Sequence, residues 1–152
     1  MTVRAYQPED RAEAVELLGD LRALDGPGRR VQVAEDPAAA SGRRLAGVAT
    51  WSKAAGGGEG QFGALVVQEP GDRRLFHELI RACVAEAMVE GVTRGYATVR
   101  EPGMVAELRW FLGVEPEPAG WDPETKRPVV WRFTVELGPL LDGMNRRIAG
   151  PV

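Results

Sequence analysis

The side chains best suited to chemistry gather in one short stretch, from Glu69 to His77. A carboxylate such as Glu69 can act as a general base, and the only histidine, His77, is a second proton-transfer group. Arg73 and Arg74 add two positive charges, which suit the binding of an anion. Each feature also has a plainer interpretation: Glu69 as a turn carboxylate, the two arginines as a solvated first helical turn, and His77 as a surface residue.

Cysteine and metal chemistry receive little support. Cys83 is the only cysteine, so an internal disulfide is excluded and a reducing compartment is expected. Its place in an apolar helical stripe predicts a small buried hydrophobe with a raised pKa, not a nucleophile. No group of Asp, His or Cys has the spacing of metal ligands in the sequence, so no metal site is predicted.

The elements that must position residues 69–77 follow from the apolar pattern. Alternating and β-rich runs predict strands at 2–6, 31–33, 44–52, 61–68, 95–99 and 129–137. Apolar residues three or four apart predict helices at 9–18, 72–90 and 104–112. The helix at 72–90 has the widest apolar stripe, built on Leu75, Leu79, Cys83 and Met88. The predicted order is β-α-β-β-β-α-β-α-β, with a proline-rich link before the last strand.

Composition limits the class of protein. A chain of 152 residues with 44% apolar content is long enough for one packed domain. Its formal charge of −3 provides no basic field for a phosphate backbone, so nucleic acid is excluded as an expected partner. There is no run of 18 apolar residues and no basic leader with an apolar stretch, so we expect no membrane span and a cytoplasmic location.

This order of elements, together with three short motifs, resembles the GNAT (Gcn5-related N-acetyltransferase) superfamily over residues 2–137. The start VRAYQPED at 3–10 is similar to the family's IRPYRPED, WFLGV at 110–114 is similar to its Y-x-K-L-G-F helix end, and WRFTV at 131–135 is similar to its closing strand. The resemblance implies an α/β (α+β) fold with a mixed, mainly antiparallel central sheet and flanking helices. It also implies a GNAT-like domain at 1–137 and a C-terminal extension at 138–152.

The resemblance also assigns roles near the start of the 72–90 helix. In GNAT enzymes an R/Q-x-x-G-x-G/A sequence opens this helix, and its backbone N–H groups bind the pyrophosphate of acetyl-CoA. Aligned on Leu79, the motif falls on Gly71, Arg74 and Phe76, so both glycines are replaced and the Phe76 ring is an expected obstacle. The cofactor-binding candidates in this degenerate loop are Gly71, Asp72, Arg73, Arg74 and Phe76. Glu69, the nearest carboxylate, is the candidate base for an attacking amine.

Two functions follow from the resemblance and both stay open. The first is a non-catalytic structural or interaction component of a larger assembly, such as a phage virion component, because GNAT-like proteins occur in virions and three motif positions are altered. Its location is then the cytoplasm or a virus particle assembled there. The second is a divergent acetyl-CoA-dependent N-acetyltransferase, in which an amine attacks the thioester directly. Acetyl-CoA is the implied cofactor only in this second case.

The extension at 138–152 is not required by a GNAT-like fold. Its apolar residues recur at helical spacing and predict one or two helical turns with a single apolar side; they are Leu140, Leu141, Met144 and Ile148. A helix this short is marginal alone in water, so its apolar side must be covered, either by the parent domain or by another chain. A protein partner or a second copy of the chain is therefore expected at these residues.

Overall fold

A computed structural model describes residues 2–26, 28–36, 44–54, 57–69 and 71–149, with the backbone alone for 147–149. Its strands are β1 (Thr2–Ala5), β2 (Arg29–Glu35), β3 (Leu45–Lys53), β4 (Glu59–Val67), β5 (Arg94–Val99), β6 (Glu117–Trp121) and β7 (Pro128–Glu136). Its α-helices are α1 (Arg11–Leu18), α2 (Arg73–Val89), α3 (Pro102–Leu112) and α4 (Leu137–Ala149). Two short 3-10 helices, Pro8–Asp10 and Leu21–Ala23, flank α1.

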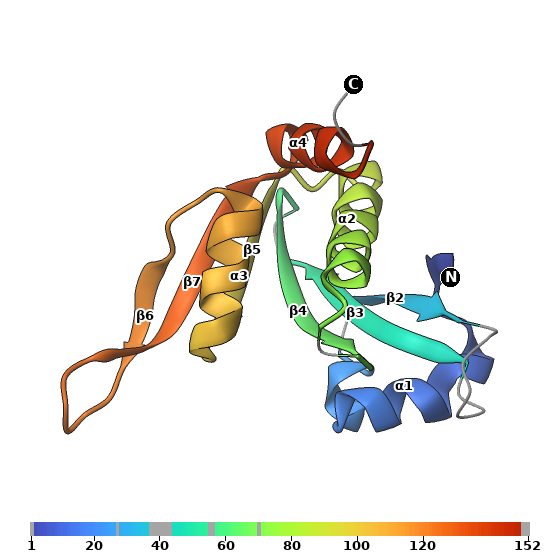
Figure 1. Cartoon of the computed structure of the whole chain (residues 1–152), viewed down its shortest axis with the longest axis horizontal. Coiled ribbons are helices and arrows are strands. Elements are labelled where there is room, and N and C mark those ends of the chain that lie inside the picture. Colours follow the sequence, from blue (N-terminus) through green and yellow to red (C-terminus); the bar gives the residue numbers. More distant parts are fainter. Residues whose placement is uncertain (1, 27, 37–43, 55–56, 70, 150–152) are drawn as a thin grey trace.

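The strands form one mixed sheet in the order β1-β2-β3-β4-β5-β7-β6. All neighbours pair antiparallel except β4 and β5, which are parallel. That parallel pair is short: Glu59 pairs with Arg94, Gly60 with Gly95 and Gln61 with Tyr96. Beyond Gln61 and Tyr96 the two strands part, and Figure 1 shows them diverging. The sheet is therefore split into two halves joined at one end.

Helices pack on both faces of the first half of the sheet. Helix α2 buries Leu79, Cys83 and Ala87 against Ala49 and Trp51 of β3. The opposite face is covered by α1, whose Ala14 lies in a second cluster with strand valines at 33 and 48. The spacing of three to four residues along α2 predicted this buried stripe, and the structure confirms it.

The predicted order of elements is wrong in one place, the proline-rich link before the last strand. Residues 117–121 form β6, an edge strand on β7, in which Pro118 lies opposite Trp131. Proline has no N–H to donate, so it is tolerated at an edge, and the register shifts around Gly120. A short run of Glu, Pro, Ala and Gly has no β-rich pattern, and pairing with β7 decides its conformation.

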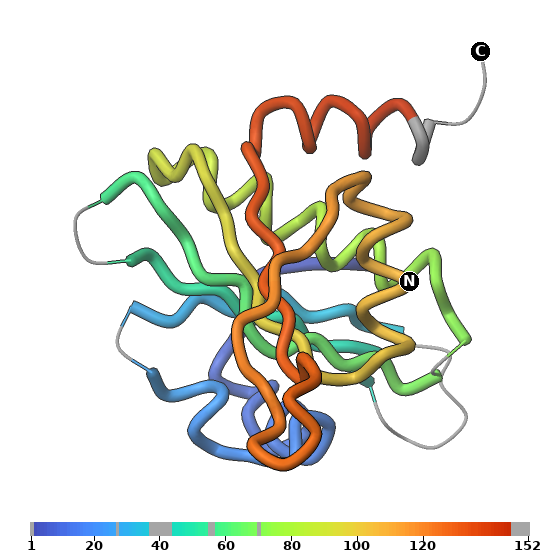
Figure 2. The backbone as a smooth tube through the Cα atoms, turned by 90° about the vertical axis from the view of Figure 1, so that its left-hand side faces the viewer, coloured from blue at the N-terminus to red at the C-terminus, as the bar shows by residue number. Residues whose placement is uncertain are grey.

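The extension at 138–152 is a longer helix than the one or two turns predicted. Helix α4 begins at Leu137, directly after β7, and Figures 1 and 2 show it across one end of the molecule. Met144 is only 1% exposed, and Leu140 and Leu141 pack against the same core cluster as α2. The sequence left open whether the parent domain or another chain covers this apolar side. At Leu140, Leu141 and Met144 the structure shows that the parent domain covers it. The side chain of Ile148 lies outside the described part of the chain.

Candidate functional site

The divergence of β4 and β5 produces a cavity of about 530 Å³. Residues from both faces of the sheet line it, including Phe62 and Val99 from the α2 face and Gln61 and Thr98 from the other. Because strand side chains alternate between faces, a cavity lined by both faces passes through the sheet between the strands. Its volume lies in the range of small-molecule sites.

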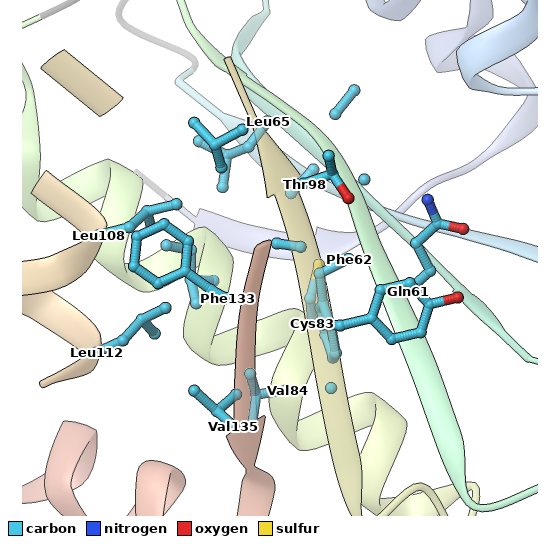
Figure 3. Close-up of a pocket in the computed structure, with 18 of the residues that line it drawn as sticks. Gln61, Phe62, Leu65, Cys83, Val84, Thr98, Leu108, Leu112, Phe133 and Val135 are labelled. Atoms are coloured by element: carbon cyan, nitrogen blue, oxygen red, sulfur yellow. The ribbon is translucent and has the colours of Figure 1, made fainter. Parts of the chain in front are cut away.

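The two ends of this cavity differ chemically. Figure 3 shows Leu108, Leu112 and Phe133 gathered at one side, and the polar ends of Gln61 and Thr98 at the other. The apolar side belongs to a cluster between α2, α3 and β7. The cavity therefore suits a ligand with an apolar part and a polar end.

The first turn of α2, where the sequence placed an anion site, carries a carboxylate of the chain itself. Asp72 is the N-cap residue, and its Oδ1 accepts a hydrogen bond from the N–H of Leu75 at 3.1 Å. Its backbone carbonyl also accepts the N–H of Phe76 at 3.1 Å. Gly71, just before it, is exposed, and its carbonyl accepts the N–H of Arg73 at 2.9 Å. Asp72 therefore places negative charge at the positive end of the helix dipole.

The two arginines of this turn form ion pairs within the chain. Arg73 Nε donates to Glu107 Oε1 of α3 at 3.0 Å, and its guanidinium lies 4.9 Å from the centre of the Trp110 ring. Arg74 Nε donates to Glu78 Oε1 at 3.3 Å, one helical turn along. The sequence predicted that Arg73 and Arg74 could offer positive charge to a bound anion. In the structure both side chains are already paired with carboxylates of the chain itself.

The sequence suggested that His77 is a plain surface residue, and the structure shows that it is not. Its ring stacks on Phe111 of α3 with centroids 3.8 Å apart and planes 7° apart, and its side chain is 15% exposed. The His77 Nε2 lies 3.1 Å from Glu107 Oε1, the oxygen that Arg73 also reaches. Burial raises the pKa of Glu107, but the hydrogen bonds from Arg73 and His77 outweigh it and leave this pKa below its usual range. This cluster joins α2 to α3.

Phe76 does not occupy the position expected for an obstacle at the loop. Its ring is 7% exposed and packs with Val105, Leu108 and Phe133, where it lines the cavity. Glu69 lies in the turn before α2, where its carbonyl accepts the N–H of Asp72 at 2.9 Å, and its side chain is exposed. Glu69 is not among the cavity-lining residues of the described chain, and its role as a base stays a prediction.

Cys83 also lines the cavity. The thiol is buried, and burial holds its pKa far above the ordinary value. A neutral thiol is a poor nucleophile, which agrees with the sequence-based interpretation of Cys83 as a small buried hydrophobe.

A second, more polar pocket of about 330 Å³ lies open to solvent on the α1 side of the sheet, over β5 and β7, and most of its lining residues are exposed. Its lining residues are Glu59, Arg94, Tyr96, Arg132 and Thr134. Tyr96 lies on the strand predicted at 95–99, and no functional role was predicted for it, although alternation along 94–99 puts Arg94, Tyr96 and Thr98 on one face. Tyr96 lines both cavities, so the two are neighbours.

Two buried polar atoms next to the larger cavity have no hydrogen-bond partner in the described part of the chain, Thr50 Oγ1 and Arg29 Nε. Both side chains approach Gly63: a Cβ at this glycine would lie 3.0 Å from Thr50 Oγ1 and 3.1 Å from Arg29 Nη1. Nothing in the sequence pattern singled out either residue.

In residues 2–26, 28–36, 44–54, 57–69 and 71–149, no three His, Cys, Asp or Glu side chains are grouped closely enough to hold a metal ion. Within those same ranges, no helix is both long and apolar enough to cross a bilayer.

Comparison with known proteins gives a result for the fold. No protein-family model matches the chain, and no curated protein matches it significantly in sequence. Solved structures do match. A Desulfovibrio desulfuricans protein assigned to the GNAT family of acetyltransferases is 14% identical, with a TM-score of 0.62 and coverage of 90% of this chain and 99% of that one. The Escherichia coli ribosomal-protein-S18-alanine N-acetyltransferase is 12% identical, with a TM-score of 0.65 and coverage of 90% and 93%.

A third solved structure contains coenzyme A. An aminoglycoside 6'-N-acetyltransferase complexed with coenzyme A is 13% identical, with a TM-score of 0.65 and coverage of 90% of this chain and 97% of that one. The match covers nearly the whole of each protein. This chain therefore has the fold of the GNAT acetyltransferases.

Proposed function

We propose that this chain is a non-catalytic GNAT-fold protein that serves as a binding or structural component of a larger assembly. The observation that carries the proposal is the carboxylate of Asp72 on the N–H of Leu75 at the start of α2. A GNAT enzyme uses backbone N–H groups at this turn to hold the pyrophosphate of acetyl-CoA. A carboxylate in that place repels a phosphate and occupies one of the donors.

The residues of the turn therefore do not fit a pyrophosphate. Arg73 is paired with Glu107 and Arg74 with Glu78, so binding a phosphate at either guanidinium has to compete with an existing ion pair. Arg74 and Phe76 also replace the glycines that permit close backbone approach in the family's motif. A virion component is one such assembly role, and a cytoplasmic complex is another.

A divergent acetyl-CoA-dependent N-acetyltransferase is the second candidate, and one observation favours it. The cavity between β4 and β5 is kept at about 530 Å³ and not filled by side chains. Coenzyme A is bound by a protein of the same fold, the aminoglycoside 6'-N-acetyltransferase. For this candidate Glu69 remains the predicted base.

Calorimetry with coenzyme A and acetyl-CoA on the full chain separates the two candidates. We expect a Kd above about 1 mM for both, which corresponds to about −4 kcal/mol or weaker. Asp72→Asn is the informative variant, because asparagine keeps the helix cap and removes the charge. Tighter coenzyme A binding by this variant supports the charge argument, while micromolar binding by the native chain contradicts the proposal.

A test of assembly accompanies the test of cofactor binding. The native chain should have no N-acetyltransferase activity with acetyl-CoA and a panel of amines, and it should co-sediment with a partner in its native particle or complex. Turnover that depends on acetyl-CoA and is lost in Glu69→Gln would favour the second candidate.

A further inference from the structure

The pocket over β5 and β7 contains, besides the carboxylate of Glu59, four side chains that can bind an anion. Arg132 lies with its guanidinium 5.7 Å from the centre of the Tyr96 ring, within the range of a cation–π contact. Thr134 is the strand partner of Tyr96, so its hydroxyl lies on the same face. Arg94 closes one side, where it is paired with Glu136 at 2.9 Å.

Arg132 contacts an aromatic ring, whereas several other arginines pair with carboxylates. The guanidiniums of Arg4, Arg11, Arg30 and Arg94 each pair with a carboxylate. Within the described ranges, no carboxylate lies in ion-pair distance of Arg132. A guanidinium stacked on a ring has its flat face occupied, while its N–H edge stays available for the two oxygens of a carboxylate.

The charges around this cavity decide between kinds of anion. Arg94 and Arg132 contribute two positive charges, and Glu59, Glu136 and Glu117, which lies opposite Arg132 on β6, contribute three negative ones. A dianion such as phosphate is repelled by this excess of negative charge more strongly than a singly charged carboxylate, which needs only one guanidinium edge.

The neighbouring cavity indicates the rest of the ligand. Tyr96 lines both cavities, and the larger one continues from it between β4 and β5 to the apolar side chains around Phe133. A carboxylate at Arg132 therefore has an apolar space of about 530 Å³ beside it. A ligand with a charged end and a hydrocarbon part satisfies both environments.

From this arrangement we propose that the chain binds an organic monocarboxylate, whose carboxylate is held by Arg132 with the hydroxyls of Tyr96 and Thr134 and whose apolar part enters the cavity between β4 and β5. The carboxylate end of this site uses none of the residues at the start of α2, while its apolar end shares the cavity between β4 and β5 with the second candidate function. For a chain that serves as a binding component, as proposed above, organic monocarboxylates are the class of ligand that it binds.

Three probes test the proposal on the full chain by NMR titration at constant ionic strength, with hexanoate as the carboxylate, hexanamide as its neutral match and inorganic phosphate as the dianion. We expect saturable shifts of the β5 and β7 amides with hexanoate at millimolar concentration, and binding at least about tenfold weaker, about 1.4 kcal/mol, for hexanamide and phosphate. Equal binding of hexanoate and hexanamide would overturn the role of the charge.

Variants then assign the contact. Arg132→Gln should weaken hexanoate binding at least about tenfold, while the matched control Arg127→Gln, an exposed arginine in the link between β6 and β7, should leave it unchanged. Tyr96→Phe keeps the ring beneath Arg132 and removes one hydroxyl, so it should cost less than Arg132→Gln. Unchanged binding in Arg132→Gln, in a variant whose spectrum shows the native fold, would refute the site.

Discussion

A Cβ atom placed on Gly95 would lie 2.5 Å from Cε2 of Phe62, so the ring of β4 occupies the space that any other residue on β5 would need. The ring cannot easily move away, because its centroid lies 6.2 Å from that of the buried Trp51, with the planes 23° apart. This close approach lies at the end of the short β4–β5 pairing, where the cavity begins.

Gly95→Ala should therefore destabilise the chain by about 1–3 kcal/mol, as other overpacked cores do. Urea unfolding followed by far-UV circular dichroism measures the change. Gly58→Ala is the matched control, because its Cβ would meet only Thr93 Oγ1 at 3.9 Å, an ordinary contact. A loss in Gly95→Ala no larger than in Gly58→Ala would contradict the packing described for Phe62.

The cap on α2 gives a second prediction. Asp72→Ala should lower the free energy of unfolding by about 1 kcal/mol, because the N–H of Leu75 loses its acceptor. Asp72→Asn should stay within about 0.5 kcal/mol of the native chain, since asparagine caps nearly as well. Thermal melts of the two variants make the comparison, and equal melting temperatures for alanine and asparagine would argue against the cap.

Leu79 is the central residue of the α2 stripe, with no exposed surface. Leu79→Ala should cost about 2–5 kcal/mol, because it removes buried methyl groups and leaves a cavity. Val89→Ala, at the exposed end of the same helix, should change stability by less than about 0.5 kcal/mol. Chemical denaturation of the pair tests the assigned face, and similar losses in both would refute it.

Helix α4 should stabilise the domain that carries it. Removing the chain after Leu137 deletes Leu140, Leu141 and Met144 from the core cluster, so the melting temperature should fall. Met144→Ala should account for about 2–5 kcal/mol of the loss, while Asp142→Ala, on the exposed side, should be close to neutral. If truncation leaves the melt unchanged but abolishes assembly measured by analytical ultracentrifugation, α4 serves a partner instead.

The pH dependence of stability should report the Arg4–Asp10 pair, in which Arg4 donates to both carboxylate oxygens at 2.7 and 2.9 Å. The hydrogen bond from Arg4 holds the pKa of Asp10 below its ordinary value of 3.8, against the effect of burial. A lowered pKa in the folded state stabilises it above pH 3.8, and this contribution disappears as the pH falls through the lowered value.

Asp10→Asn should accordingly cost about 1.5–3 kcal/mol at pH 7, the range for hydrogen bonds to charged groups. The gap between native chain and variant should stay level down to about pH 5 and then close as acid protonates Asp10. Urea titrations across pH 2–7 follow it. A gap that widens in acid would mean that the folded-state pKa of Asp10 is raised.

The sequence was sufficient for the parts of the fold that depend on local pattern. The stripe of Leu75, Leu79 and Cys83 located α2, because burial of one helical face leaves a period in the sequence. The match to GNAT-fold structures confirms the sheet class that the order of elements predicted. Strand β6 was missed because an edge strand takes its conformation from its neighbour, β7.

The site was harder to predict because its contacts join distant residues. Asp72 stands at an N-cap position that its sequence context makes recognisable, yet its effect on an anion site depends on where its carboxylate points. His77 stacks on Phe111, 34 residues further along the chain, and Arg132 meets Tyr96 only through the pairing of β5 with β7. Contacts of this kind leave no periodic signal.

The short pairing of β4 with β5 has a mechanical consequence. At the joined end, the N–H of Leu137 donates to the carbonyl of Thr93 at 2.9 Å, and α4 packs on α2 just beyond. A hydrogen bond and a packed helix therefore both stabilise this end. At the other end, the facing edges of β4 and β5 have no strand between them. The sheet should therefore behave as a hinge, with slow amide hydrogen exchange in β5 beside Gly95 and Tyr96. Fast exchange is expected only at the β4 amides beyond Gln61 that face β5, because the alternate amides pair with β3.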